Sequence, residues 1–339
     1  MYYVGIDVHQ RRSSVEILDQ NGALYKRFEV RGPWTEVIGK IEKETPRPYA
    51  VAYEASCGYG YLHDALARRA ARVEVAHPGK VRLIFNSKHK FDRIDAAKLG
   101  KLLFLGAIPQ VHVPSAAVRA GRALVEFRQQ LVTRKVGAKN RIKALLRGLG
   151  IESPIKRLWT QAGIIWLKAL ALDPLDGFRR DVLVAELRRY HREIRRVDKK
   201  LMAMMDQDSR VDLLRTIPGV GFHTAAAFII YIDQIERFSN VRQVGNYFGI
   251  VPRQDTSAGK TRLGHITKDG PATVRKLVCE ASWMAIRKSP SLRQRYERII
   301  KHSADRKKIA ITAIGHHLLR VMAAMLRTGE MWRETPATS

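Results

Sequence analysis

Short segments of alternating apolar and polar residues open the chain, and apolar residues at helical spacing interrupt them from residue 34 onward. The first segment, YYVGIDV, is followed by HQRR, and the third is preceded by QNG, as in consecutive hairpins. The pattern predicts strands at 2–8, 13–19, 23–30, 48–56 and 72–78, and helices at 34–44, 61–70 and within 90–106. This order indicates an α/β sheet that carries helices on its faces.

The middle of the chain changes to a purely helical and very basic pattern. One long helix has apolar residues at the alternating spacing of a coiled-coil seam, namely Leu183, Leu187, Tyr190, Ile194, Val197, Leu201 and Met204. An earlier helix offers a second stripe, Leu124, Phe127, Leu131, Ile142, Leu145 and Leu149. Either an intramolecular helical hairpin or a dimer would fill this seam, and one sequence does not decide between them.

The last third opens with TIPGVG ahead of an apolar helix. Such a turn either presents backbone N–H groups to a phosphate or joins two packed helices. Further on, residues 251–270 are polar, glycine-bearing and basic, which predicts an exposed loop. The fold class we expect is α/β plus all-α, with an α/β domain at 1–113, a helical coiled-coil domain at 114–215 and a mostly α-helical domain at 216–339.

Charge indicates the partner. Lys and Arg number 61 against 32 Asp and Glu, a formal net charge of +29, which attracts nucleic acid with strong salt dependence. The longest uninterrupted apolar run, residues 225–232, is far shorter than a membrane span, and the N-terminus lacks a signal-peptide pattern, so we expect a cytoplasmic protein without a membrane partner. Cys57 and Cys279 lie far apart and are expected to be small buried thiols rather than a disulfide or zinc site.

Four acids stand out in this basic chain. Asp7 lies inside the first predicted strand, Glu54 near the end of the fourth, and Asp92 and Asp95 three apart on one helix face. Acids at a helix start also serve as caps, an interpretation that suits Asp92 and Asp95 but not Asp7. If the first and fourth strands are neighbours, the four carboxylates converge, and a divalent cation of the Mg²⁺ or Mn²⁺ type would neutralise them and promote phosphodiester displacement.

The order of several motifs resembles a known family. GIDVH, AYEASCGYG, KFDRIDAAKLGKLL, TIPGVG, FGIVPRQDTSAGKTRLGHITKDG and HHLLRVMAAMLRTGE follow the landmarks of the DEDD-type insertion-sequence transposases of the IS110 family, the bridge-RNA-guided serine recombinases. The resemblance implies an RNase H-like (RuvC-like) N-terminal domain. It also implies that Asp7, Glu54, Asp92 and Asp95 are catalytic and bind Mg²⁺. It does not decide whether one or two ions bind.

The basic segment 251–270 carries a second candidate site. Arg253, Lys260, Arg262 and Lys268 are suited to binding nucleic acid and stabilising charge on a phosphate, while a serine in such a segment is ordinarily a turn former. The family resemblance implies that Ser257 is the catalytic nucleophile that joins a DNA phosphate. Thr256 is the alternative hydroxyl, because Ala258 stands where relatives usually have glycine.

The resemblance further implies an RNA-guided transposase that exchanges strands through a phosphoserine intermediate. Its partners would be target and donor DNA, a guide (bridge) RNA and further copies of the chain, as a dimer or a tetramer on DNA. The setting would be the prokaryotic cytoplasm, in association with the nucleoid. Two alternatives are a metal-dependent Holliday-junction-type endonuclease that uses water, and a non-catalytic scaffold for nucleic acid.

Overall fold

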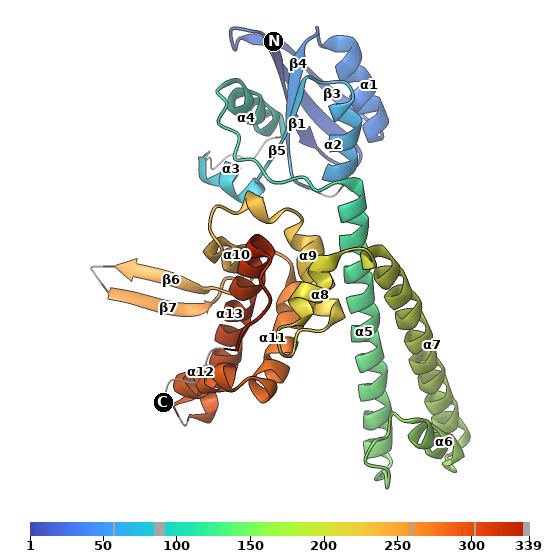
Figure 1. Cartoon of the computed structure of the whole chain (residues 1–339). Helices are drawn as coiled ribbons and strands as arrows, with labels where there is room; N and C mark the ends of the chain where they lie inside the picture. The colour runs from blue at the N-terminus through green and yellow to red at the C-terminus, as the bar shows by residue number, and fades with distance from the viewer. Residues whose placement is uncertain (57, 85–91, 258–259, 302, 335–339) are drawn as a thin grey trace. The chain divides into compact units, whose positions relative to one another are not determined.

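The computed structural model describes residues 1–56, 58–84, 92–257, 260–301 and 303–334 (Figure 1). The chain forms two compact units, Met1–Arg119 and Ala120–Ser339. The predicted domain boundaries at 113 and 215 remain predictions.

The first unit is built on a five-stranded sheet. Its strands are β1 Tyr2–Val8, β2 Arg12–Leu18, β3 Leu24–Arg31, β4 Tyr49–Glu54 and β5 Arg72–Ala76. Their order is β3-β2-β1-β4-β5, with β1 antiparallel to β2, β2 antiparallel to β3, and β1, β4 and β5 parallel. The five predicted strands and the expected adjacency of the first and fourth are confirmed.

Helices cover both faces of this sheet (Figure 1). On one face, α1 (Trp34–Glu44) and α2 (Tyr59–Ala67) bury Val4 and Ile6 of β1. On the other face lies α4 (Asp92–Phe104), whose Leu99 and Leu103 pack against Ala50 and Ala52 of β4. The predicted helices are therefore confirmed, and the alternation of side chains along β1 and β4 decides which residues face which helix.

A short helix that the sequence pattern did not predict, α3 (Pro78–Ile84), follows β5. Its first residue, Pro78, falls within the predicted strand, but proline suits the first turn of a helix because its missing N–H is not needed there. The stop of α4 is as expected, since Gly106 adopts a positive φ of 63° just past the helix end.

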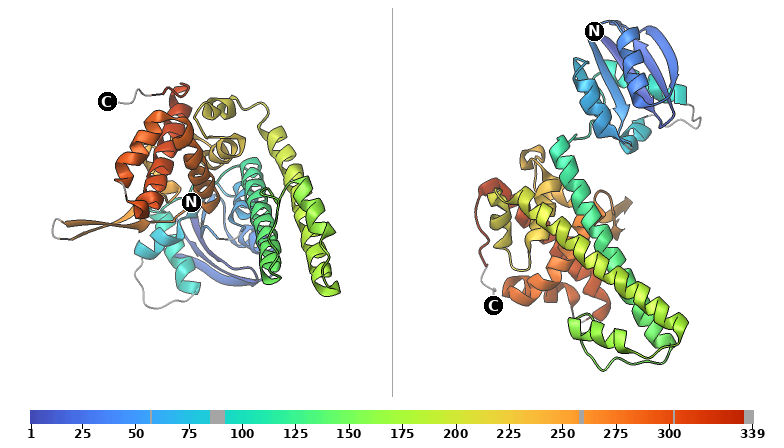
Figure 2. Two further views of the ribbon diagram at one scale, coloured as in Figure 1. Left: turned by 90° about the horizontal axis from the view of Figure 1, so that it is seen from below. Right: turned by 90° about the vertical axis from the view of Figure 1, so that its right-hand side faces the viewer.

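The second unit begins with a long helical hairpin. Helices α5 (Ala116–Gly148) and α7 (Pro174–Met205) lie side by side, with α6 (Gln161–Ala169) between them in sequence (Figure 2). Arg128 pairs with Asp198 and Arg141 with Glu186, so the two helices run antiparallel. The coiled-coil seam is thus filled within the chain, as the hairpin alternative predicted.

The buried stripe of α7 differs at its ends from the predicted one. The structure buries Val184 and Met205, whereas Leu183 is only half-buried and Met204 is exposed. A heptad repeat follows 3.5 residues per turn and an α-helix has 3.6, so the buried stripe drifts around the helix over several turns. On α5, the predicted Phe127 is likewise exposed, and Val125 and Leu146 are buried; the predicted Leu149 is exposed and lies just past the end of the helix.

The rest of the second unit is a helical core. Its helices are α8 Ser209–Arg215, α9 Phe222–Ile232, α10 Arg242–Tyr247, α11 Ala272–Lys288, α12 Pro290–Ile300 and α13 Lys307–Thr328. Every residue of α9 from Thr224 to Ile232 is buried, so this helix lies at the centre of the core. In the TIPGVG turn, a Cβ on Gly219 would lie 2.6 Å from the Ala281 carbonyl oxygen of α11. Close helix packing therefore accounts for this glycine without a bound phosphate.

One segment, Ala304–Thr328, is long and apolar enough to cross a membrane by length and composition, although it contains no single long apolar run. Half of its apolar window is buried inside the protein, and α13 packs against α11 and α12. This segment is a core helix and does not indicate a membrane protein. Cys279 is half-buried, which raises the pKa of its thiol, while Cys57 lies outside the described residues.

Candidate active site at the carboxyl ends of two parallel strands

Asp7 faces α4 because of the alternation along β1. Val4 and Ile6 are completely buried on the α1 and α2 face, so Gly5 and Asp7 lie on the opposite face. A Cβ on Gly5 would clash with the Ala96 carbonyl oxygen, which shows how closely α4 approaches this strand. The Asp7 side chain is 20% exposed, and its Oδ2 lies 3.2 Å from His9 Nε2.

Glu54 is the last residue of β4, directly beside β1. The parallel register pairs Ile6 with Tyr53, so the next position brings Asp7 opposite Glu54 at the same end of the sheet. Glu54 shares the α4 face with Ala52 and Ala50, which lie two and four residues before it on the strand. The convergence of these two acids follows from the strand order and the register.

Asp95 approaches from α4. It lies in the first turn of that helix, next to Ala96, the residue that contacts Gly5. Its Oδ1 lies 3.0 Å from Lys98 Nζ. The backbone of Asp92 begins α4 one turn earlier, and its side chain lies outside the described part of the structure. The contribution of Asp92 therefore stays a prediction.

The three described acids influence one another electrostatically. The pKa of Glu54 is raised, first by burial and then by the negative charges of Asp95 and Asp7. Arg82 of α3 and Lys98 of α4 act in the opposite direction. A half-buried carboxyl whose pKa is raised by burial and by two neighbouring acids marks a site that favours a cation.

The donor set suits a hard divalent cation, since it consists of carboxylate oxygens. Among the side chains that the structure describes, however, no three His, Cys, Asp or Glu residues lie close enough together to hold a metal ion. Asp7 contacts His9 and Asp95 contacts Lys98 instead. Asp7, Glu54 and Asp95 thus face a common region without forming a closed ligand shell.

The segment that carries Ser257 is a β-ribbon, and the prediction of a loop was wrong. Strands β6 (Pro252–Ser257) and β7 (Lys260–Ile266) pair antiparallel and project from the helical core of the second unit (Figure 1). Both strands are predominantly polar, and a strand exposed on both faces needs no apolar positions. Its composition of Gly, Ser, Lys and Arg therefore concealed the strand pattern.

The candidate residues of this ribbon occupy defined register positions. Ser257 ends β6 and pairs with Lys260, while Thr256 pairs with Thr261. The Thr256 hydroxyl accepts a hydrogen bond of 3.2 Å from Gln254 Nε2. The side chains of Ser257 and Lys260 are not among those described, so the structure does not choose between the two hydroxyls.

The cations of the ribbon are exposed where the structure describes them. Arg253 and Arg262 lie on β6 and β7, and Lys268 follows β7. Lys268 adopts a positive φ of 61°, with its N–H donated to the Gly249 carbonyl oxygen. These exposed cations suit contact with a phosphate backbone.

Two family models match the chain in succession. The model of DEDD transposases of the IS110 type, described as a transposase, matches residues 4–151, and the model described as transposase of the IS116/IS110/IS902 family matches residues 211–297. The first range holds all four acids, and the second holds Ser257. By these matches the chain is an IS110/IS116-family transposase.

Curated relatives of this transposase cover most of its length. It is 27% identical to the transposase for insertion sequence element IS1328 of Yersinia enterocolitica, over 82% of each chain. It is 23% identical to the transposase for insertion sequence element IS1111A of Coxiella burnetii, over 92% of this chain and 82% of that one. A probable family 20 transposase of Pseudomonas aeruginosa is 24% identical over 97% of this chain and 98% of its own.

Two cations near the acids of the transposase, Lys98 and Arg82, were not predicted from the sequence. Lys98 follows Asp95 by three residues on one helix face, a spacing that would have predicted the ion pair. Arg82, which lowers the pKa of Glu54, lies on the unpredicted helix α3 and is far from the acids in sequence. No local signal links Arg82 to Glu54, since the sheet topology brings them together.

Proposed function

We propose that this transposase cuts and exchanges DNA strands at the Asp7, Glu54, Asp92 and Asp95 site, guided by an RNA. The pairing of β1 with β4 carries the proposal for this site, because it brings Asp7 opposite Glu54, and Asp95 and Asp7 both act electrostatically on Glu54. The guide RNA is implied by the family resemblance. The sheet order supports it, since three antiparallel strands followed by two parallel ones are expected of an RNase H-like (RuvC-like) domain.

The acids would hold Mg²⁺ or Mn²⁺, which when bound activates and stabilises the oxygens of a phosphodiester displacement. Asp7 and Glu54 project from adjacent strand ends, so the sheet itself sets their separation. Lys98 neutralises Asp95 until the site is loaded, and its long side chain then has a nearby phosphate as an alternative partner.

We propose Ser257 as the nucleophile. Its Oγ would form a bond to the phosphorus as the bond from phosphorus to the DNA 3′ oxygen breaks, with the hydroxyl proton passing to a carboxylate and a proton returning to the 3′ oxygen. The new phosphoserine bond retains the energy of the phosphodiester, so the free 3′-hydroxyl of an exchanged strand can reverse the step. Arg253, Lys260, Arg262 and Lys268 would bind the backbone there.

The proposed partners are target and donor DNA, a guide (bridge) RNA and further copies of the chain. The net charge of +29 supports binding of polyanions in general. The ribbon lies in the second unit and the acids in the first. An assembly of several copies that joins these two halves is implied by the family resemblance.

Trapping the covalent intermediate tests this function. We expect labelled DNA carrying the end sequence of the element, mixed with Mg²⁺ and the protein and then denatured, to remain attached to the wild-type chain. Asp7→Asn and Ser257→Ala should each reduce attachment at least about 100-fold, as is typical when a catalytic group is removed.

Matched variants complete this test. Thr256→Ala should retain attachment, and so should Glu29→Gln, which changes another partly exposed acid of the same sheet, one paired with Arg12. Clean nicking of DNA by Ser257→Ala would instead indicate a nuclease that uses water. Loss of attachment in Thr256→Ala but not in Ser257→Ala would reassign the nucleophile.

A further inference from the structure

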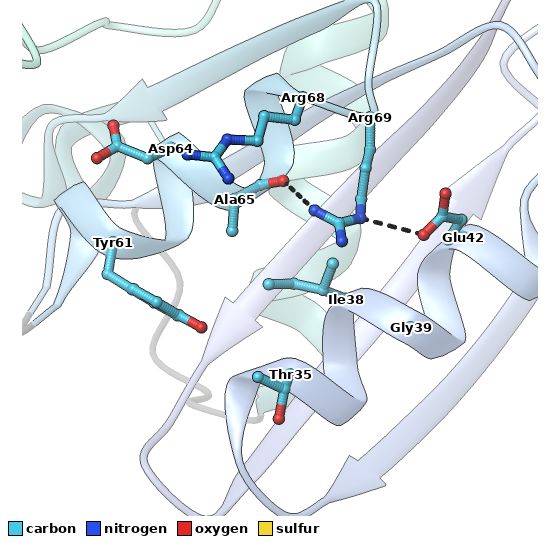
Figure 3. A pocket seen from close by; sticks show the side chains of 9 residues that line it. All are labelled: Thr35, Ile38, Gly39, Glu42, Tyr61, Asp64, Ala65, Arg68 and Arg69. Carbon is cyan, nitrogen blue, oxygen red and sulfur yellow. Dashed lines mark hydrogen bonds and ion pairs between the residues drawn. The ribbon is translucent and has the colours of Figure 1, made fainter.

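A groove runs between α1 and α2 on the face of the sheet opposite α4. Residues four and seven apart on each helix line it, namely Thr35, Ile38, Gly39, Glu42, Tyr61, Asp64, Ala65, Arg68 and Arg69 (Figure 3). Its volume is about 410 Å³. A second hollow of about 300 Å³ shares Thr35 and Tyr61 and adds Gln10, Pro33 and Trp34. The two hollows are neighbours, because they share these two lining residues.

Two aromatic rings stand where the hollows join. The ring centroids of Trp34 and Tyr61 lie 6.1 Å apart with an interplanar angle of 30°. Tyr61 is 52% exposed, so one face of its ring is open to solvent beside Trp34. The indole ring of Trp34 packs against Gly58. Gly58 has a φ of 79°, and because it lacks a Cβ, it leaves room for this ring.

This aromatic pair lies near the candidate active site. Trp34 Nε1 donates a hydrogen bond of 3.3 Å to the His9 carbonyl oxygen, and His9 Nε2 lies 3.2 Å from Asp7 Oδ2. Trp34 and Asp7 are thus connected through one intervening residue. The aromatic pair and the acids lie at the same end of the sheet, on opposite faces.

The groove carries cations beyond the aromatic pair. Arg68 and Arg69 lie near the far end of α2, about 10 Å from Tyr61 by the rise of the helix. The carboxylates of the groove already have partners, because Glu42 pairs with Arg47 and Arg69, and Asp64 pairs with Arg119. The lining itself holds two arginines and two acids, but with the partners of those acids counted, four arginines (Arg47, Arg68, Arg69 and Arg119) stand beside two carboxylates. This surplus of positive charge attracts a negatively charged chain.

We propose that Trp34 and Tyr61 form a stacking platform for one unpaired nucleobase, with the phosphate backbone of the same strand running toward Arg68. Exposed aromatic rings beside arginines are the general means by which proteins bind single strands, because every base has a face for stacking. This inference rests on the proposed function and extends it, since the strand held here would lie next to the strand that is cut.

Binding of short oligonucleotides tests the platform without requiring cleavage. We expect Tyr61→Leu, which keeps an apolar side chain but removes the ring, to bind a dT oligonucleotide or an rU oligonucleotide roughly 5- to 100-fold more weakly, the range for one stacked base. Affinity is measured by fluorescence anisotropy in the absence of divalent ions. Weaker binding of the dT oligonucleotide identifies the bound strand as DNA, and weaker binding of the rU oligonucleotide identifies it as RNA.

Two controls make the result specific. Tyr25→Leu changes another exposed tyrosine in an aromatic pair, with Tyr2 at 5.0 Å, at the opposite end of the sheet, and should bind as the wild type does. Duplex DNA should bind Tyr61→Leu and wild type equally. The platform is refuted if Tyr61→Leu matches wild type in both single-strand arms, a result that leaves the covalent attachment test of the proposed function untouched.

Discussion

Burial displaces the pKa of individual side chains in both units, with different consequences. At Glu54, burial and two neighbouring acids raise the pKa, which describes a site suited to a cation. At His317 on α13, burial and the positive charges of Arg295 and Arg320 lower the pKa to about 4. The first displacement belongs to the proposed chemistry, and the second to the stability of the core.

His317 makes the stability of the second unit depend on pH. The unfolded chain binds the proton near pH 6.5 and the folded chain only near pH 4, so the free energy of unfolding falls as the pH is lowered from 6.5 toward 4. The loss attributable to this group is about 3 kcal/mol, at about 1.4 kcal/mol per unit. Urea unfolding at pH 4 and pH 7 measures it.

The substitution His317→Gln should remove most of this pH dependence, because glutamine does not titrate. A matched control, His265→Gln, changes an exposed histidine of β7 and should leave the dependence as it is in the wild type. An unchanged pH profile in His317→Gln would show that other groups govern the acid sensitivity.

At the scale of elements, the contact between α4 and β1 positions the acids. Gly5 of β1 and Gly100 of α4 allow the two backbones to approach closely, and this approach brings Asp95 toward the strand end that carries Asp7. The two glycines differ in the space around them. A Cβ on Gly5 would clash with α4 backbone atoms, whereas a Cβ on Gly100 would lie 3.6 Å from Gly5 N, an ordinary contact.

We therefore expect Gly5→Ala to destabilise the first unit by about 3 kcal/mol or more, since overpacking displaces α4 as a whole. Covalent attachment to DNA should fall with it, because Asp95 moves with the helix. Gly100→Ala is the matched variant at the same contact and should be neutral or stabilising by up to about 1 kcal/mol. Thermal unfolding of both variants provides the measurement, and equal unfolding temperatures would contradict the close approach.

At the scale of the whole molecule, the positive charge is spread over both units. The described cations of the ribbon, Arg253 and Arg262, are exposed, whereas many arginines of the helical hairpin pair with acids on the same or the facing helix, such as Arg179 with Asp176 and Arg196 with Glu193. Asp255 lies opposite Arg262 in the register of the ribbon, but both described arginines are exposed and can reach a phosphate backbone, which releases counterions. The ribbon should therefore contribute strongly to the salt dependence of binding.

The double variant Arg253→Gln and Arg262→Gln should reduce the slope of log K against log salt concentration for DNA binding by about 2, because each arginine is expected to neutralise one phosphate. The control replaces the paired Arg179 and Arg196 with Gln and should change the slope less, because these guanidinium groups already have partners. Titrations at several salt concentrations measure both slopes. A larger change in the control would locate the DNA on the hairpin instead.

Hydrophobic periodicity alone was sufficient for the five strands and for helices α1, α2 and α4 of the first unit, for the long helices of the hairpin and for the positions of the four acids within these elements. These features are local, because alternation and helical spacing express which face of each segment is buried.

Tertiary structure decided the rest. The sheet register brought Asp7 opposite Glu54, and α3 brought Arg82 to Glu54. Helical drift moved the seam to Val184 and Met205, and strand pairing made a ribbon of β6 and β7. Such features depend on contacts between residues distant in sequence, which no local pattern records.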